Sequence, residues 1–286
     1  MPNLKVVLPQ EDIEIEFEER EGPRPEELRL LEAMLFASAT PLDEKELAAR
    51  LPEGAAQPKA VIVPHAGYAY SGAVAGSAYA RLAAGRDVIR RVVLFGPTHR
   101  VPIRGLALPS ARAFATPLGN IDVDRAAVAA ALALPCVCES DAAHAFEHSL
   151  EVQLPFLQTV LGEFTIVPFA VGDATPQEVA DVIRLLWGGS ETLIVVSSDL
   201  SHYHGYAEAR AIDRATANDV LALSPTLDHE QACGATPING LLLCARERGM
   251  RPELLDLRNS GDTAGDKSRV VGYASFAFAG GADGRS

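Results

Sequence analysis

The sequence has few cysteines and no long apolar run. It contains four cysteines in 286 residues, a number too small for a disulfide framework and typical of proteins from a reducing compartment. No stretch approaches the roughly 18 consecutive apolar residues of a membrane-spanning helix, and no basic start followed by an apolar segment indicates a signal peptide. We therefore expect a cytoplasmic protein without a membrane segment.

Basic residues are also fewer than acidic residues. Lysine and arginine number 25 against 38 aspartates and glutamates, which gives a formal net charge of −13. Residues 1–54 contain 14 acidic and 6 basic residues, a net of −8, and the remaining residues carry a net of −5. Because affinity for nucleic acids comes largely from basic side chains that neutralise phosphates, we expect no nucleic acid partner.

Changes in charge and in the spacing of apolar residues divide the chain into four predicted parts. Residues 1–22 read as an acidic tail, and residues 23–55 as a small helical appendage in which apolar residues recur at helical spacing. Residues 56–280 alternate short apolar runs with helical segments, and residues 281–286 form a second tail. Hydrophobic residues make up 48% of the chain, which is enough for a packed core in the third part.

The alternation within residues 56–280 predicts a single α/β domain with a mostly parallel central sheet flanked by helices. The predicted strands are apolar throughout because helices cover both faces of such a sheet. They span 60–63, 92–95, 164–171, 193–196 and 270–278. The predicted helices span 73–83, 125–132, 150–161, 176–186, 207–223 and 238–248.

Three histidines each follow the end of a predicted strand. His65 follows the strand at 60–63, His99 follows the strand at 92–95, and His202 follows the strand at 193–196. The carboxyl ends of parallel strands face one crevice, so the three imidazoles are expected to converge, and imidazole is a common ligand for Zn, Fe and Cu. The sequence has no HExxH or CxxC spacing that would add support for a metal site. The alternative is that each histidine is a hydrogen-bonded polar residue at the end of a strand.

Cys233 is a candidate for a further metal ligand. It precedes a predicted helix in the segment Cys-Gly-Ala-Thr-Pro-Ile, where a metal and the helix N-terminus would lower the pKa of its thiol. The alternative is a buried structural cysteine. The other three cysteines, Cys136, Cys138 and Cys244, are interpreted as structural, and Cys244 is placed in the core by its apolar helix.

Three residues, His202, His148 and Asp199, are candidates for catalytic and positioning roles, and His202 is expected to move protons. His148 precedes the predicted helix at 150–161, and we interpret it as a substrate-facing or proton-transfer residue, with a solvated surface histidine as the alternative. Asp199, three residues before His202, is expected to orient that imidazole or to cap the segment that follows. His144, four residues before His148, is predicted to lie on the surface.

These motifs, in this order, resemble those of the MEMO family, whose bacterial and archaeal members are labelled AmmeMemoRadiSam system protein B. The resemblance spans about residues 56–280 and implies the LigB-like fold of class III extradiol ring-cleaving dioxygenases. The motifs are Pro64-His65-Ala66-Gly67-Tyr68, Gly96-Pro97-Thr98-His99, Glu147-His148-Ser149-Leu150-Glu151 with Leu154-Pro155, Ser197-Ser198-Asp199 with His202, and Cys233-Gly234 with Pro237-Ile238.

The resemblance implies a metal centre with His65, His99 and Cys233 as ligands and His202 beside them. The dioxygenases hold Fe(II) with two histidines and a carboxylate, so Cys233 is a departure from their pattern. We expect a divalent ion or Cu(I), with Fe(II) preferred over Zn or Cu, because a thiolate is a soft ligand. The implied activity is that of a metal-dependent, dioxygenase-like oxidoreductase acting on an unidentified small substrate. The alternative is a non-catalytic metal- or ligand-binding module.

Two further resemblances concern partners. Residues 24–54 are similar to the start of ScpB, the segregation and condensation protein B, which raises the remote alternative of a chromosome-segregation adaptor. A fragment of this length is too short for an independent winged-helix core. The AmmeMemoRadiSam label also implies a pathway link to AMMECR1-like and radical SAM proteins.

Overall fold

The computed structural model describes residues 57–280, and four adjacent parallel strands form their centre. Two of these strands, Ala60–Val63 and Thr192–Ser197, consist entirely of buried residues, which explains why their sequences are apolar without alternation. The predicted appendage at 23–55 and the tails at 1–22 and 281–286 lie outside the described residues. In spatial order the strands are β1 (Ala60–Val63), β8 (Thr192–Ser197), β2 (Arg91–Pro97) and β7 (Thr165–Val171).

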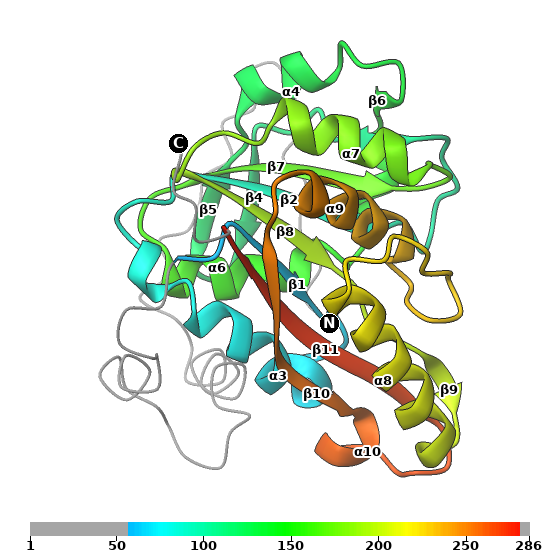
Figure 1. Cartoon of the computed structure of the whole chain (residues 1–286). Coiled ribbons are helices and arrows are strands. Elements are labelled where there is room, and N and C mark those ends of the chain that lie inside the picture. The colour runs from blue at the N-terminus through cyan, green and yellow to red at the C-terminus, as the bar shows by residue number, and fades with distance from the viewer. Residues whose placement is uncertain (1–56, 281–286) are drawn as a thin grey trace.

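Helices cover both faces of these strands (Figure 1). The connections from β1 to β2 and from β7 to β8 run in opposite directions across the sheet, so right-handed crossovers place their helices on opposite faces. One face carries α3 (Tyr68–Ala80) and α6 (Leu154–Val160), which contact each other. The other face carries α7 (Pro176–Leu185), α9 (Ala235–Glu247) and α8 (Tyr206–Leu221). The predicted α/β fold, with a large, mostly parallel sheet flanked by helices, is confirmed.

The edges of the sheet are antiparallel, a feature that the sequence did not predict. β11 (Val270–Ala279) pairs antiparallel with β1, with β10 (Arg251–Asn259) and with β9 (His202–His204). At the other edge β3 (Leu106–Leu108) runs antiparallel to β7 and parallel to β6 (Val137–Glu139). A separate hairpin is formed by β4 (Ala113–Thr116) and β5 (Gly119–Asp122).

The helix boundaries follow local signals that periodicity alone did not resolve. The helix predicted at 73–83 begins earlier, at Tyr68. The segment predicted as one helix at 150–161 is a 3₁₀ turn, η2 (Glu151–Gln153), followed by α6, whose first turn contains Pro155. Proline suits the first turn of a helix because its missing N–H would have no partner there. The remaining elements are η1 (Ala83–Gly85), α4 (Arg125–Ala131), α5 (Asp141–Ala145) and α10 (Ser260–Thr263).

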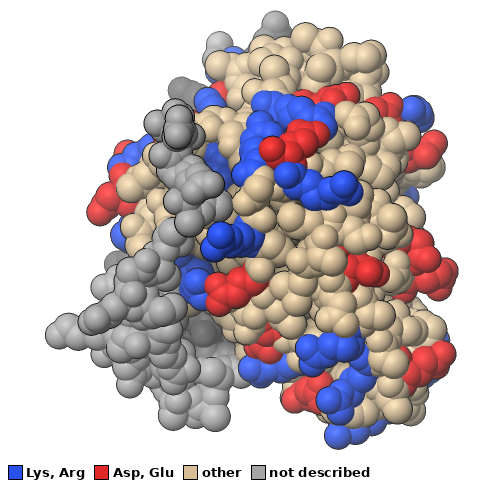
Figure 2. All heavy atoms as spheres, viewed as in Figure 1, with Lys and Arg blue, Asp and Glu red and all other residues tan. Residues whose placement is uncertain are grey.

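Two sequence expectations about the molecular surface bear on partners. Within residues 57–280, no helix has the length and apolar character needed to cross a membrane. Figure 2 shows basic and acidic side chains interspersed on the face in view, without a continuous basic stripe among the described residues there.

Candidate metal centre

The candidate centre lies where three neighbouring strands end. His65 follows β1, Asp199 follows β8 and His99 follows β2, and these strands are adjacent in the sheet with their carboxyl ends at one edge. Cys233 reaches the same edge from the loop before α9. That loop lies close to β8 because Gly234 has no side chain: a Cβ there would lie 2.6 Å from the Ser198 Cβ.

The predicted ligand atoms of His65, His99 and Cys233 all lie within 4.8 Å of one another. The His65 Nε2 is 3.5 Å from the Cys233 Sγ. A tetrahedral ion with bonds of about 2.0–2.1 Å to nitrogen and about 2.3 Å to sulfur separates two such ligand atoms by about 3.5–3.6 Å. The spacing of these side chains therefore fits a bound transition-metal ion.

A hydrogen-bond chain determines which nitrogen of His65 is free. The Ser197 hydroxyl donates its single hydrogen to the Ser149 carbonyl (2.6 Å) and accepts from the Gln153 Nε2 (2.8 Å). Its contact of 2.9 Å with the His65 Nδ1 therefore requires the ring nitrogen to be the donor. The proton sits on Nδ1, and Nε2, which faces Cys233, has a free lone pair for a metal.

Gln153 fixes the direction of that chain. It is fully buried, and its Nε2 also donates to the Pro64 carbonyl at 2.9 Å. Its Oε1 accepts from the Tyr79 hydroxyl at 2.9 Å. Because a carbonyl oxygen only accepts, the bond to Pro64 sets the orientation of the amide, and the amide in turn makes Ser197 an acceptor.

Glu147 positions His99 in the same way. Its Oε1 lies 2.9 Å from the His99 Nδ1, so that nitrogen donates and Nε2 is free. The carboxylate also accepts from the backbone N–H groups of His99, His148 and Ser149. Burial alone would raise the pKa of Glu147, but the hydrogen bonds from His99 and Ser149 outweigh it and hold the pKa at about 2.

The local environment keeps the ligand imidazole neutral and the thiol protonated before a metal binds. Burial, and then the proximity of His99 and His148, lowers the pKa of His65 to about 3. Burial, and then the nearby Asp199 carboxylate, raises the pKa of Cys233 to about 12. A metal ion binding here must therefore displace a proton from Cys233.

Asp199 makes contacts that differ from the expected ones. It accepts from the backbone N–H groups of His65 (2.8 Å) and Ala66 (3.2 Å) and so holds the turn after β1. Within residues 57–280 no hydrogen bond or ion pair joins it to His202. Burial raises the pKa of Asp199, so the two backbone donors are what make a buried carboxylate tolerable.

Of the other predicted histidines, His148 lies beside the candidate ligands. The ring centroid of His148 is 5.5 Å from that of His99 and 5.8 Å from that of His65, and its side chain is 49% exposed. His202 lies on β9, paired with Val271, and is partly exposed. The prediction that His144 lies on the surface is wrong: it is 6% exposed, and its Nε2 contacts the Ala107 carbonyl at 3.1 Å.

Sequence reasoning missed the role of Glu147. It forms a second group of potential ligands with His99 and His148, and this group shares His99 with the first. Glu147 lies 48 residues after His99 in the sequence. Their hydrogen bond can therefore be recognised only when it is known which loops are adjacent in the fold. Of the cysteines not assigned to the centre, Cys244 is buried as predicted, Cys138 is exposed and Cys136 is partly buried.

Comparisons with known proteins place this chain in a family. The profile of the family described as "Memo-like protein" matches residues 36–277. A "MEMO1 family protein" of Sulfolobus acidocaldarius is 37% identical over 232 residues, which cover 76% of this chain and 81% of that protein. A "MEMO1 family protein" of Aquifex aeolicus is 34% identical over 270 residues, covering 88% of this chain and 100% of that protein.

A solved structure has a similar fold. The crystal structure of an uncharacterized protein from Escherichia coli K12 matches with a TM-score of 0.50 and 13% identity, over 76% of this chain and 98% of that chain. This likeness concerns the fold alone. Because the family profile spans most of the sequence and the relatives are 34% and 37% identical over most of their length, the protein belongs to the Memo-like protein family.

Proposed function

We propose that this protein binds one transition-metal ion through His65, His99 and Cys233 and acts as a metal-dependent oxidoreductase on a small substrate. The observation that carries the proposal is the convergence of three ligand atoms within 4.8 Å from separate parts of the chain. The Nδ1 atoms of the two histidines are engaged by Ser197 and Glu147, which leaves their Nε2 atoms for the ion. Such outer hydrogen bonds are a general property of metal-binding histidines.

The donor set favours a soft or borderline ion. Two neutral imidazoles and one thiolate suit Fe(II), Zn or Cu(I) better than Mg or Ca, which prefer oxygen ligands. We propose Fe(II) as the resident ion, with Zn and Cu as the alternatives. Three protein ligands leave a coordination position for substrate or water, which is the arrangement of catalytic rather than structural sites.

The remaining side chains suggest how protons move. A bound metal would supply Lewis acidity or an electron-transfer centre for the substrate. His148 is half exposed and its ring adjoins both ligand imidazoles, so it is placed to exchange a proton with a substrate at the open side. His202 is proposed as a second proton-transfer group. Asp199 contributes by holding the backbone of His65.

Metal analysis of the anaerobically purified protein tests the proposal. We expect about one Fe, Zn or Cu per chain, and loss of that metal in His65→Ala and in Cys233→Ala. Cys244→Ala is the matched control, because that thiol is buried in α9 away from the centre. A protein that takes up none of these ions, or that retains them in both ligand variants, contradicts the proposal. Substrate binding that survives both ligand substitutions would instead support a non-catalytic binding module.

A further inference from the structure

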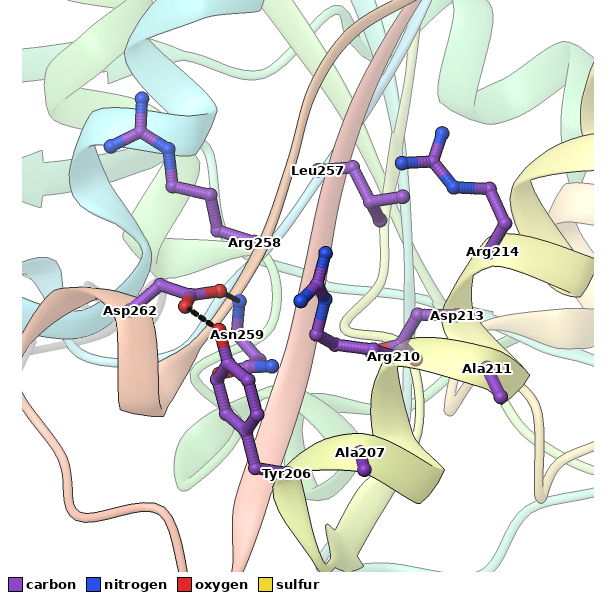
Figure 3. A pocket seen from close by; sticks show the side chains of 10 residues that line it. All are labelled: Tyr206, Ala207, Arg210, Ala211, Asp213, Arg214, Leu257, Arg258, Asn259 and Asp262. Carbon is purple, nitrogen blue, oxygen red and sulfur yellow. Dashed lines mark hydrogen bonds between the residues drawn. The ribbon is translucent and has the colours of Figure 1, made fainter.

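A cavity of about 580 Å³ lies between α8, β10 and α10, and no residue assigned to the metal centre lines it (Figure 3). The space exists because α8 presents the small side chains of Ala207 and Ala211 here, with Leu257 of β10 also in the lining. Ligand sites in proteins commonly enclose about 300–1,000 Å³. The cavity is therefore large enough for a small metabolite.

Arginine side chains gather at this cavity although the protein has a net charge of −13. Arg210 and Arg214 come from successive turns of α8, and Arg258 comes from β10. Arg258 is paired with Asp256 through contacts of 2.9 and 3.0 Å. Within residues 57–280, Arg210 and Arg214 form no ion pair. Two like charges four residues apart on a helix repel each other, and an anion between them would relieve that repulsion.

The carboxylates of the cavity are already engaged by donors from the protein. Asp262 accepts from the Tyr206 hydroxyl (2.5 Å) and from the backbone N–H of Asn259 (3.1 Å), as Figure 3 shows. Asp213 is buried and accepts from the backbone N–H of Ser201 (3.1 Å). These hydrogen bonds direct both carboxylates towards protein donors, and neither of them pairs with the arginines of α8.

A buried amide provides an unsatisfied donor at the same place. Asn259 lines the cavity and is 1% exposed. Its Oδ1 accepts from the Gly261 N–H at 3.0 Å, whereas its Nδ2 has no hydrogen-bond partner among the described residues. Leaving a buried donor without an acceptor is costly, and an oxygen of a bound anion would satisfy it.

We propose that this cavity is a second binding site, for a small organic molecule that carries an anionic oxygen group, a phosphate or a carboxylate. Arg210 and Arg214 hold the anionic group, because a guanidinium presents paired N–H donors that match both groups. The Asn259 amide contributes a further donor. Leu257 provides apolar surface for the remainder of the ligand.

Calorimetric titration of the full-length protein with inorganic phosphate and, separately, with succinate tests this site. We expect the wild-type protein to bind at least one of the two. The double variant Arg210→Gln/Arg214→Gln should bind at least about tenfold more weakly, equivalent to about 1.4 kcal/mol. Ala211→Leu should weaken binding equally, because leucine fills the cavity without changing charge and is a good helix former at an exposed position.

Two control variants separate this site from other sources of anion binding. Arg246→Gln removes an exposed arginine of α9, and His65→Ala disables the metal centre, and both should keep wild-type affinity for the probe. Binding of phosphate alone or of succinate alone supports the site and identifies the anionic group. The proposal is overturned if the wild-type protein binds neither probe, or if Ala211→Leu binds as tightly as wild type.

Discussion

Glu147 and His99 form a carboxylate–imidazole pair in which the Oε1 and Nδ1 atoms are 2.9 Å apart and the carboxylate is nearly inaccessible to solvent. The pair leaves the Nε2 of His99 free and makes it a stronger electron donor. It also ties the loop after β2 to the loop before α6, because the same carboxylate accepts three backbone N–H groups. One buried acid therefore shapes two walls of the candidate centre.

Replacing this acid should weaken metal binding without removing a ligand. We expect Glu147→Gln to lower metal affinity by about 10- to 100-fold, the usual effect of losing such an outer partner. Competition with a chromophoric chelator measures the change. Glu151→Gln is the control, since Glu151 lies four residues along and is outside both groups of potential ligands. Equal affinities in wild type and Glu147→Gln would contradict the positioning role.

The hydroxyl of Ser197 should control the tautomer of His65. In the wild-type protein without metal, long-range ¹H–¹⁵N NMR spectra should show a protonated Nδ1 and a bare Nε2 on His65, because Ser197 accepts from Nδ1. In Ser197→Ala the Nδ1 loses its acceptor, so we expect a mixture of tautomers and weaker metal binding. A wild-type spectrum with the proton on Nε2 would refute the hydrogen-bond chain through Gln153.

Metal binding should release a proton. The pKa of Cys233 is raised to about 12 by burial, whereas the pKa of His65 is lowered to about 3, so near pH 7 the thiol holds a proton and this imidazole is neutral. We expect release of about one proton per ion bound. Calorimetry in buffers of different ionisation enthalpy measures this number. Proton release that is unchanged in Cys233→Ala would show that the thiol is not a ligand.

Asp213 should make the protein less stable as pH rises. Burial raises its pKa from 3.8 to about 6, so the folded state holds this proton more tightly than the unfolded chain does. Its stabilising contribution is complete below pH 4 and is lost as pH rises through 6, by up to about 3 kcal/mol. Urea unfolding of wild type and Asp213→Asn across this range measures the difference. A difference that does not vary between pH 4 and pH 7 would contradict the raised pKa.

The sequence predicted the centre of the fold and the convergence of His65, His99 and Cys233 better than the edges of the sheet and the supporting contacts. Strands such as β8 were visible because a strand buried on both faces is apolar throughout. β9 and β5 are three and four residues long and largely polar, so they carry no such signal. β10 was also not predicted, although it forms one wall of the cavity between α8 and α10.

The convergence of His65 and His99 was predictable because both follow parallel strands, whose ends share one edge of a sheet. The hydrogen bonds that orient them were not. Asp199 was expected to serve His202, yet it holds the backbone of His65, which is 134 residues away. Such contacts depend on loop conformation, and loop conformation has no periodicity that a sequence pattern could report. The ScpB-like fragment and the pathway link to radical SAM proteins stay predictions.

X-ray absorption spectroscopy of the metal-loaded protein tests the central claim most directly. It should show about two nitrogen scatterers near 2.0–2.1 Å and one sulfur scatterer near 2.3 Å from the ion, if zinc is the probe metal. The sulfur contribution should persist in Cys244→Ala, whereas Cys233→Ala should not retain the ion. A spectrum of the wild-type protein with only oxygen and nitrogen neighbours would contradict the proposed ligand set.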